Sequence, residues 1–351
     1  MILEHAVLRI RTRSAHEFEA ALREALPLIE SAPGCHGAEV RPQVENPDTY
    51  LLLVRWDSVE AHMDFRASDI FPRWKELTHH FYDPFPEVTH FAEPVSRAMG
   101  VGVNDEELHG FVRRAPRDNK WSHAVQIFAG SPSMPGAAGL VVRGAMAGGA
   151  SMVRLATRGN LPSGVGVPVE AVYADHFDDR CVAVAAGPGL GSDCDEWLAE
   201  KLLTVAVPVV LDADALRPSV VALRPADQTW ILTPHAGEFA RLTGNTPTLE
   251  SVRALAASSG CVVLAKGPET IVARTDGDYR VVTSGTAQLA TAGSGDVLTG
   301  LIVGALASGH EPWAAAYLAA HLHGLAGQRL TPHEGAGVLA DHVRAILSEL
   351  P

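Results

Sequence analysis

The chain has 351 residues and a formal net charge of −13, with 47% hydrophobic and 20% charged residues. This length is more than one hydrophobic core usually serves and indicates two domains. The acidic balance argues against nucleic acid as a partner, because binding its phosphate backbone needs clustered lysine and arginine. No apolar run reaches the about 18 residues that a membrane helix needs, so no membrane partner is expected either.

The amino-terminal residues and the cysteines favour a cytoplasmic location. His5, Arg9 and Arg11 interrupt the first residues, which therefore lack the apolar core of a secretory signal peptide. The four cysteines lie far apart and show no CxxC spacing, which favours reduced, buried thiols over a metal site or disulfide bonds.

The first part of the chain, residues 1–95, has the pattern of a small α+β domain. Strands are predicted at residues 2–12, 37–43, 50–56 and 87–91. Helices are indicated by an apolar stripe at Phe18, Leu22, Leu26 and Ile29, by a cap at Ser58 and by the pattern at 71–81. The resulting order, β-α-β-β-α-β, is that of a ferredoxin-like fold.

Three segments of this domain carry a family resemblance: PGCHGAEV, YLLLVRWDSVEAHMDF and FPEVTHF. With them the domain resembles the antibiotic-biosynthesis monooxygenase (ABM) family of small dimeric α+β barrels. That family includes cofactor-free oxygenases, haem-degrading enzymes and members without a catalytic role, so the resemblance leaves the activity of the domain open. Because one face of the sheet is left open, we expect a homo-oligomer that pairs through the ABM-like domain.

Four histidines of this domain are the candidates for chemistry: His62, His79, His80 and His90. His79 and His80 are adjacent, so on a helix they point about 100° apart and cannot share a metal simply by being neighbours. A surface or pocket-lining role is favoured over catalysis, and we assign no site residue in the ABM-like domain.

The next stretch, residues 96–118, contains proline, glycine and mixed charges without an apolar stripe. We expect a linker here, with one short helix at 105–112. Such a linker allows the two domains to pack separately but does not require it.

The second domain, residues 119–351, alternates short apolar strands with helical patterns. Strands are predicted at 124–129, 151–156, 181–186, 207–211, 230–232 and 261–265. Because these strands are continuously apolar, they predict an α/β fold in which helices cover both faces of a parallel sheet. Glycine-rich and polar loops follow the strands, and ligands of such sheets bind at this carboxyl edge.

The segment ATAGSGDVLTG, residues 290–300, points to the chemistry of the second domain. Gly293 and Gly295 precede a buried helix, so backbone N–H groups can turn toward one point and form an anion site that the helix dipole strengthens. Asp296 in the first turn can simply stabilise the helix. Beside an anion, however, a carboxylate is unusual unless it handles a proton, so we favour a catalytic role.

Other nucleotide sites fit the sequence less well. GPGLGS lacks the third glycine of a Rossmann dehydrogenase fingerprint, and no P-loop motif GxxxxGK[ST] is present. A late glycine segment followed by aspartate resembles the ribokinase-like superfamily instead. Eight segments in register make the resemblance closer: NKWSHA, AGSPSMPGAAGL, GPGLG, PVVLDADAL, LTPHAGEFARLTG, LAKGPETIVA, GTAQLATAGSGDVLTG and AYLAAHLHGLAG.

With these segments, residues 119–351 are similar to the ADP-dependent NAD(P)H-hydrate dehydratase family. Members of that family repair hydrated NADH or NADPH, consuming ADP and giving the normal cofactor, AMP and phosphate. The resemblance therefore implies a lyase that takes the S form of hydrated NADH or NADPH as substrate and ADP as co-substrate, with Mg²⁺. The usual fusion partner is an epimerase of the hydrated cofactor, and no epimerase segment is visible in this chain.

The resemblance also implies roles for single residues. Asp296 takes the proton of the ring hydroxyl as that hydroxyl attacks the β-phosphate of ADP. Contacts to the substrate are expected from Ala137, Gly189, His235 and Asp296, and contacts to the nucleotide from Lys266, Gly267, Pro268, Glu269, Thr270, Gly293 and Gly295. No metal ligand is assigned, because Asp212 and Asp214 can either contact Mg²⁺ or cap the following helix.

Some alternatives stay open at this stage. A kinase of a small alcohol or vitamin precursor uses the same glycine segment, and the ABM-like domain is then either a cofactor-free oxygenase or a dimerisation module. His235 can be a solvated residue at a helix start. Two segments, 121–123 (Trp-Ser-His) and 282–285 (Val-Thr-Ser-Gly), depart from the family pattern, and we expect them to alter substrate fit rather than to remove activity.

Overall fold

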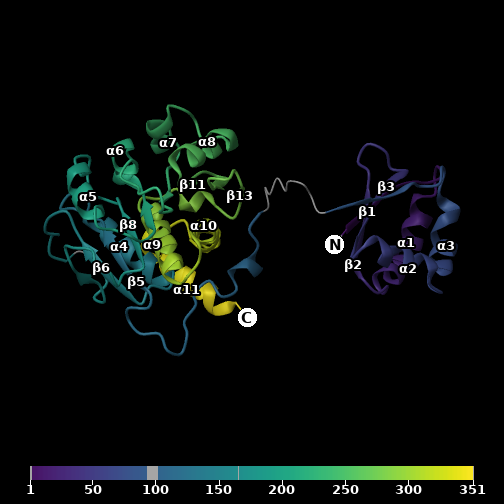
Figure 1. The fold of residues 1–351 in the computed structure, drawn as a ribbon, viewed down its shortest axis with the longest axis horizontal. Helices are drawn as coiled ribbons and strands as arrows, with labels where there is room; N and C mark the ends of the chain where they lie inside the picture. The colour runs from purple at the N-terminus through teal and green to yellow at the C-terminus, as the bar shows by residue number, and fades with distance from the viewer. Residues whose placement is uncertain (1, 93–101, 165, 351) are drawn as a thin grey trace. The chain divides into compact units, whose positions relative to one another are not determined.

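The computed structural model describes residues 2–92, 102–164 and 166–350, and the chain forms two compact units, residues 1–97 and 98–351 (Figure 1). Each unit is described by itself. Across the described ranges, no helix is long and apolar enough to cross a membrane.

The N-terminal unit is a four-stranded antiparallel sheet in the order β2-β3-β1-β4, with its helices packed on one face. Its elements are β1 (Ile2–Arg9), α1 (Ala15–Glu30), β2 (Cys35–Pro42), β3 (Thr49–Trp56), α2 (Val59–Ala67), α3 (Phe71–Thr78), a 3₁₀ turn (His79–Phe81) and β4 (Val88–Phe91). The predicted ferredoxin-like order is thus confirmed. Ala6 and Leu8 of β1 point into the core with Phe18 of α1, while Val7 between them is 39% exposed on the other face.

The C-terminal unit is built on a nine-stranded sheet in the order β13-β12-β11-β10-β9-β8-β5-β6-β7. Its strands are β5 (Ala124–Phe128), β6 (Met152–Ala156), β7 (Val172–Tyr173), β8 (Ala183–Ala186), β9 (Val209–Leu211), β10 (Ile231–Leu232), β11 (Val262–Ala265), β12 (Thr270–Ala273) and β13 (Tyr279–Val282). Strands β5 to β11 are parallel to one another. All six strands predicted for this domain are among them.

Helices cover both faces of this sheet, as the sequence predicted. One face packs against α4 (Pro135–Ala147), α9 (Ser294–Ala307), α10 (Pro312–Gln328) and α11 (Leu339–Glu349). The other face packs against α5 (Asp195–Leu202), α6 (Pro218–Val221), α7 (Ala236–Thr243) and α8 (Leu249–Ser259). In β8 the side chains alternate between these two cores, and because both are apolar the strand reads as continuously hydrophobic.

The structure differs from the expected parallel sheet at one edge. The strands β12 and β13 pair antiparallel with each other, and β12 pairs antiparallel with β11. A tight turn at Asp276 and Gly277 joins them, with the Asp276 carboxylate accepting from the Asp278 backbone N–H at 3.0 Å. Aspartate followed by glycine favours such a hairpin, so the sequence did contain a signal for it.

Part of the stretch expected as a linker is packed onto the C-terminal unit. Residues 105–108 form a 3₁₀ turn rather than the longer helix expected at 105–112. Leu108 and Phe111 are fully buried in the core beside α10 and α9, and the His310 side chain hydrogen-bonds the Phe111 carbonyl oxygen at 2.8 Å. The part of the predicted linker at 96–101 lies outside the described residues.

The helices α4 and α9 meet backbone to backbone, along a row of glycines that we call the glycine seam: Gly144, Gly148, Gly300 and Gly304. A methyl group added at Gly304 would lie 2.5 Å from the Ala145 carbonyl oxygen, and one at Gly148 would lie 2.6 Å from the Leu301 carbonyl oxygen. At Gly300 it would overlap the Val141 carbonyl oxygen. Only glycine therefore permits this close approach of the two helices.

We expect Gly300→Ala to destabilise the C-terminal unit by about 2 kcal/mol or more, because backbone atoms cannot move aside as a flexible side chain would. Urea denaturation measures this. The matched control is Gly136→Ala in the same helix pair, where an added methyl group meets nothing within 4 Å. This control should keep or slightly raise stability, by up to about 1 kcal/mol. Equal midpoints for Gly300→Ala and wild type would contradict the close contact.

Candidate active site

The amino end of α9 has the geometry of an anion site. Gly293 precedes the helix with φ of 89°, a left-handed conformation that favours glycine. The Ser294 hydroxyl donates a hydrogen bond to the Leu289 carbonyl oxygen at 2.7 Å, which fixes the turn before the helix. The first N–H groups of a helix have no partner within it, so this end of α9 can hold a negative charge.

Asp296 lies in the first turn of α9. Burial, followed by the negative charge of Asp212, raises the pKa of Asp296 from 3.8 to about 7, against an opposing effect of the Lys266 ammonium. Asp214 and Glu238 add smaller contributions in the same direction as Asp212. A carboxyl group with a pKa near 7 can accept a proton and release it at neutral pH, which is what a general base needs.

Asp212, directly after β9, is the buried centre of this site and is 1% exposed. Its Oδ1 accepts hydrogen bonds from the Lys266 ammonium at 2.7 Å and from the Thr233 hydroxyl at 2.8 Å. Its Oδ2 accepts one from the Thr299 hydroxyl of α9 at 2.7 Å. The residue makes no side-chain cap to the 3₁₀ turn that follows. The helix-cap alternative for Asp212 is therefore wrong, and protein donors already occupy both of its oxygens.

Lys266, directly after β11, is the cation among these carboxylates. Its Nζ lies 2.7 Å from Asp212 Oδ1 and 3.8 Å from Glu238 Oε2. Burial alone would lower the pKa of the Lys266 ammonium, but Asp212 and Glu238 outweigh it and raise the pKa above its ordinary value. The lysine is therefore charged and held in place by the two carboxylates.

His235 is the residue before α7, and its side chain is 56% exposed. Its Nδ1 accepts hydrogen bonds from the backbone N–H groups of Gly237 at 3.0 Å and Glu238 at 3.2 Å, while the Glu238 carboxylate accepts one from the His235 backbone N–H at 2.8 Å. This reciprocal arrangement is a capping box. Its Nε2 lies 3.2 Å from Glu238 Oε1, so both ring nitrogens already have partners in the protein. The helix-start alternative for His235 is thus correct.

A cavity of about 610 Å³ lies beside the amino end of α9. Of the predicted site residues, it is lined by His235, Lys266, Gly267, Pro268, Thr270 and Gly295. Its other walls are mostly apolar and include Val282, Leu289, Leu298 and Ala320. The cavity therefore offers a cation and a helix end for phosphates, and apolar walls for a flat ring. Glu269 and Gly293 are not among its lining residues.

A second cavity of about 860 Å³ lies at the loops after β5 and β8. It is lined by Ser131, Met134, Arg158, Leu190, Asp214 and neighbouring residues. Ala137 and Gly189 are not among the lining residues of this cavity. They contact each other beside it, since a methyl group on Gly189 would lie 2.7 Å from Ala137 Cβ. Gly189 also has φ of 68°, so only glycine fits there. The predicted substrate residues are therefore divided, with Ala137 and Gly189 near this cavity and His235 in the smaller one.

The side chains of the site do not form a metal cage. Within the described ranges, no group of three or more histidine, cysteine, aspartate or glutamate side chains is arranged to hold an ion. Both oxygens of Asp212 accept hydrogen bonds from protein groups, and Asp214 Oδ2 accepts one from the Gly191 backbone N–H at 2.8 Å. The residues present therefore do not fit a resident Mg²⁺.

Two residues that sequence reasoning did not single out lie at the cavities. His323 of α10 lines the smaller cavity and is 6% exposed, and its Nε2 has no hydrogen-bond partner among the described residues. Burial lowers the pKa of its imidazole to about 4, so the ring is neutral. Arg158 lines the larger cavity and is paired with Asp193. Both residues are visible in the sequence, but only the cavities distinguish them from ordinary core and surface positions.

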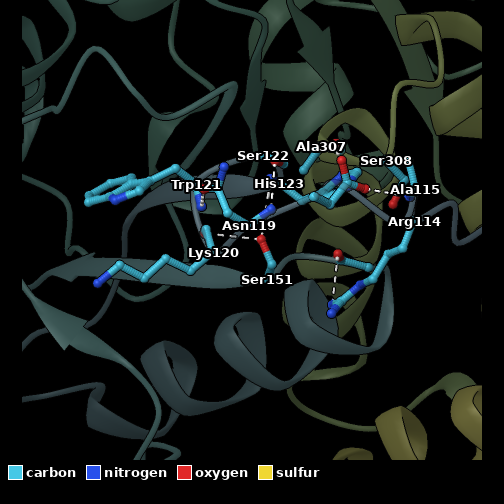
Figure 2. Close-up of polar contacts among 12 residues, drawn as sticks. Arg114, Ala115, Asn119, Lys120, Trp121, Ser122, His123, Ser151, Ala307 and Ser308 are labelled. Atoms are coloured by element: carbon cyan, nitrogen blue, oxygen red, sulfur yellow. Dashed lines mark hydrogen bonds and ion pairs between the residues drawn. The ribbon is translucent and has the colours of Figure 1, made fainter.

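The segment 121–123, which departs from the family pattern, lies away from Asp296. Figure 2 shows His123 beside Ala307, whose carbonyl oxygen lies 2.6 Å from His123 Nδ1. The other ring nitrogen, Nε2, lies 2.8 Å from the Asp118 carboxylate. Ala307 ends α9, about 16 Å along the helix from Asp296 at a rise of 1.5 Å per residue. His123 thus links the start of β5 to the carboxyl end of α9. This position does not support the effect on substrate fit that was expected for the segment 121–123.

The four candidate histidines of the N-terminal unit do not form a common site. His62 is 3% exposed, its Nδ1 lies 2.7 Å from His90 Nε2, and burial lowers its pKa to about 4. His79 lies among aromatic side chains, with 4.8 Å between the centres of its ring and the Phe85 ring. His80 is exposed. The surface position of His80 agrees with the interpretation of the sequence, whereas His62 is buried and is therefore neither a surface nor a pocket-lining residue.

Comparison with known proteins gives a family to each unit. Residues 125–349 match the family model described as NAD(P)H-hydrate dehydratase, and residues 1–77 match the one described as antibiotic biosynthesis monooxygenase. The ADP-dependent (S)-NAD(P)H-hydrate dehydratase of Bacillus subtilis is 36% identical over 233 residues, which are 62% of this chain and 84% of that protein. Ribokinase-like proteins share the fold, which confirms the predicted fold class.

Longer relatives are also similar. The bifunctional NAD(P)H-hydrate repair enzyme of Methanopyrus kandleri is 33% identical over 258 residues, covering 67% of this chain and 51% of that protein. The chain thus spans about half the length of that relative. A crystal structure of the ADP/ATP-dependent NAD(P)H-hydrate dehydratase from Bacillus subtilis, co-crystallised with ATP and Mg²⁺, has a TM-score of 0.63 and 31% identity, covering 70% of this chain and 96% of that one.

The raised pKa of Asp296 has a consequence for stability. The folded chain keeps the Asp296 proton up to about pH 7, whereas the unfolded chain loses it near 3.8, so this group destabilises the fold increasingly as the pH rises between these values. We expect Asp296→Asn to be more stable than wild type at about pH 8, on the order of 4 kcal/mol, and to match it near pH 4. Chemical denaturation at the two pH values measures the difference. No gain at the higher pH would refute the raised pKa.

Proposed function

The chain belongs to the NAD(P)H-hydrate dehydratase family, and we propose that its residues 98–351 carry out the ADP-dependent dehydration of the S form of hydrated NADH or NADPH. The products are the normal reduced cofactor, AMP and phosphate. The kinase alternative is less favoured, because the two relatives described above, from Bacillus subtilis and Methanopyrus kandleri, are named for dehydration or repair of the hydrated cofactor.

The position of Asp296 relative to the two cavities carries this proposal. Its neighbours Ser294 and Gly295 line the smaller cavity, and Asp214, whose charge acts on Asp296, lines the larger one. A carboxyl group whose neighbours line one cavity and that feels the charge of a residue lining the other can serve a reaction between two separate ligands. A nucleotide in the smaller cavity and a dinucleotide substrate in the larger one would meet at this residue.

The proposed reaction has two steps. The ring hydroxyl of the substrate attacks the β-phosphate of ADP, its proton goes to Asp296, and the bond between the β-phosphate and AMP breaks. The N–H groups at the start of α9 hold the charge on the transferred phosphoryl group. The phosphorylated oxygen is then a good leaving group, so phosphate departs from the ring with the C–O bonding electrons. The adjacent ring carbon loses a proton to water, and the double bond is restored.

We assign the binding residues on the same basis. The nucleotide is contacted by residues 266–270 and by Gly293 and Gly295, the backbone of which approaches its phosphates. We assign contacts to the hydrated cofactor to Ala137, Gly189 and Asp296, and to His235 from the smaller cavity, where the substrate would meet the nucleotide. Most of these nucleotide-binding residues line the smaller cavity, which supports their assignment. Gly293 does not line it but contributes the left-handed turn that begins α9.

We propose that Mg²⁺ enters with the nucleotide. Because the site offers no set of three ligating side chains within the described residues, the ion would be carried by phosphate oxygens and water as part of the nucleotide substrate, as Mg²⁺ usually is at such sites.

For the N-terminal unit we propose a role in assembly. The open face of its sheet carries Val7 and Phe91, which are 39% and 51% exposed, and Leu51 pairs with Val7 across β1 and β3. A second copy covering this face would bury these side chains and make a homo-oligomer.

The activity test uses purified protein with hydrated NADH and either ADP or ATP, and follows the return of the dihydronicotinamide absorbance. We expect recovery with wild type, and a loss of about a hundredfold to ten-thousandfold in kcat for Asp296→Asn, because a general base contributes roughly that much. Asp276→Asn, an exposed aspartate of the β12–β13 turn, is the matched control and should keep full activity. If the wild-type protein restores no dihydronicotinamide absorbance with either nucleotide, the dehydratase proposal is wrong.

The assembly role is tested by Val7→Glu, which places a charge on the open sheet face without touching the core. We expect this variant to be a monomer by light scattering and to keep dehydratase activity, since burying an unpaired carboxylate in an interface is costly. Val44→Glu, in the β2–β3 turn where Val44 is 94% exposed, is the control and should assemble as wild type does. An oligomer that survives Val7→Glu would contradict pairing through this face.

A further inference from the structure

Asp212 has a protein environment suited to an ionised carboxylate. It is 1% exposed, and its two oxygens together accept three hydrogen bonds, from Lys266, Thr233 and Thr299. The ammonium group of Lys266 can only donate, so a proton on Asp212 Oδ1 would have no acceptor there. Burying such a charge is unfavourable unless it is paired and fully hydrogen-bonded, and this environment meets both conditions.

This carboxylate also lies against the first turns of α9. A methyl group on Gly295, the residue before Asp296, would lie 3.3 Å from Lys266 Nζ and 3.8 Å from Asp212 Oδ2. Thr299, which donates to Asp212 Oδ2, stands three residues after Asp296 and therefore on the same side of the helix. Asp212 thus reaches the face of α9 that carries Asp296.

We propose that Asp212 is a positioning residue for the reaction: its buried negative charge makes Asp296 a stronger base, and its hydrogen bonds to Lys266 and Thr299 hold the start of α9 at the carboxyl edge of the sheet. This inference rests on the proposed function, in which Asp296 accepts the proton of the substrate hydroxyl.

The charged groups facing Asp296 come from four places in the unit. They are Asp212 after β9, Asp214 in the following 3₁₀ turn, Glu238 in α7 and Lys266 after β11. After burial, Asp212 has the largest effect and raises the pKa of Asp296, while Lys266 opposes it. Replacing Asp212 by a neutral residue removes the repulsion and also frees Lys266 to pair with Asp296. Both changes make Asp296 a weaker base.

The main test is Asp212→Asn, with two readouts in the full-length protein. One is the pH profile of kcat/KM for hydrated NADH with ADP. The other is a ¹³C carboxyl NMR titration of aspartate-labelled protein, in which the resonance missing from Asp296→Asn identifies Asp296. In both we expect the pKa of Asp296 in Asp212→Asn to fall by about one unit or more, the size typical of a lost neighbouring charge.

Two further variants separate charge from tethering. Thr299→Val removes one hydrogen bond and keeps the charge of Asp212, so it should lower kcat and leave the pKa of Asp296 unchanged. Lys266→Met removes the opposing cation, so in the titration the pKa of Asp296 should rise above its wild-type value. Asp276→Asn is the control and should move neither readout.

The outcomes distinguish this inference from the proposed function. An Asp296 titration that is the same in Asp212→Asn and wild type overturns the inference, whether or not the enzyme turns over. If Asp212→Asn does not fold, a pKa of Asp296 that fails to rise in Lys266→Met overturns it instead. If the pKa moves as expected but wild type does not dehydrate hydrated NADH, the proposed function fails while the effect of Asp212 on Asp296 stands.

Discussion

The buried ion pair between Asp212 and Lys266 is the interaction on which the C-terminal site depends. Because β9, β10 and β11 are parallel neighbours, their carboxyl ends bring Asp212, Thr233 and Lys266 together. Thr299 adds α9 to this group. Such a pair is stable away from water only when every polar atom has a partner, so it fixes the relative positions of three strand ends and one helix.

Much of this arrangement could be predicted from the sequence, because it depends on local patterns. The apolar strands of the second domain required a sheet covered on both faces, and the glycines before Asp296 required a helix start at the carboxyl edge. The ferredoxin-like order of the first domain followed from alternation and turn residues. These features are set by periodicity and backbone preference, which a single sequence displays directly.

The remainder depended on contacts between distant residues. Asp212 was expected to contact a metal or cap a helix, because its partners Lys266 and Thr299 lie 54 and 87 residues away in the chain. His323 resembles any core residue of a helix until the cavity beside it is known. The antiparallel edge was missed although Asp276 and Gly277 signal a turn, since no strand was predicted at 270–273 or 279–282. The raised pKa of Asp296 likewise arises from burial and neighbours that no local pattern contains.

The glycine seam between α4 and α9 also limits how the C-terminal unit can move. Where backbone meets backbone, there is no side chain that can change rotamer to absorb a displacement, so the two helices behave as one rigid body. Ala137 lies near the start of α4 and Asp296 near the start of α9. Their separation is therefore set by the seam at all times, and any closure around bound ligands must come from the surrounding loops rather than from these helices.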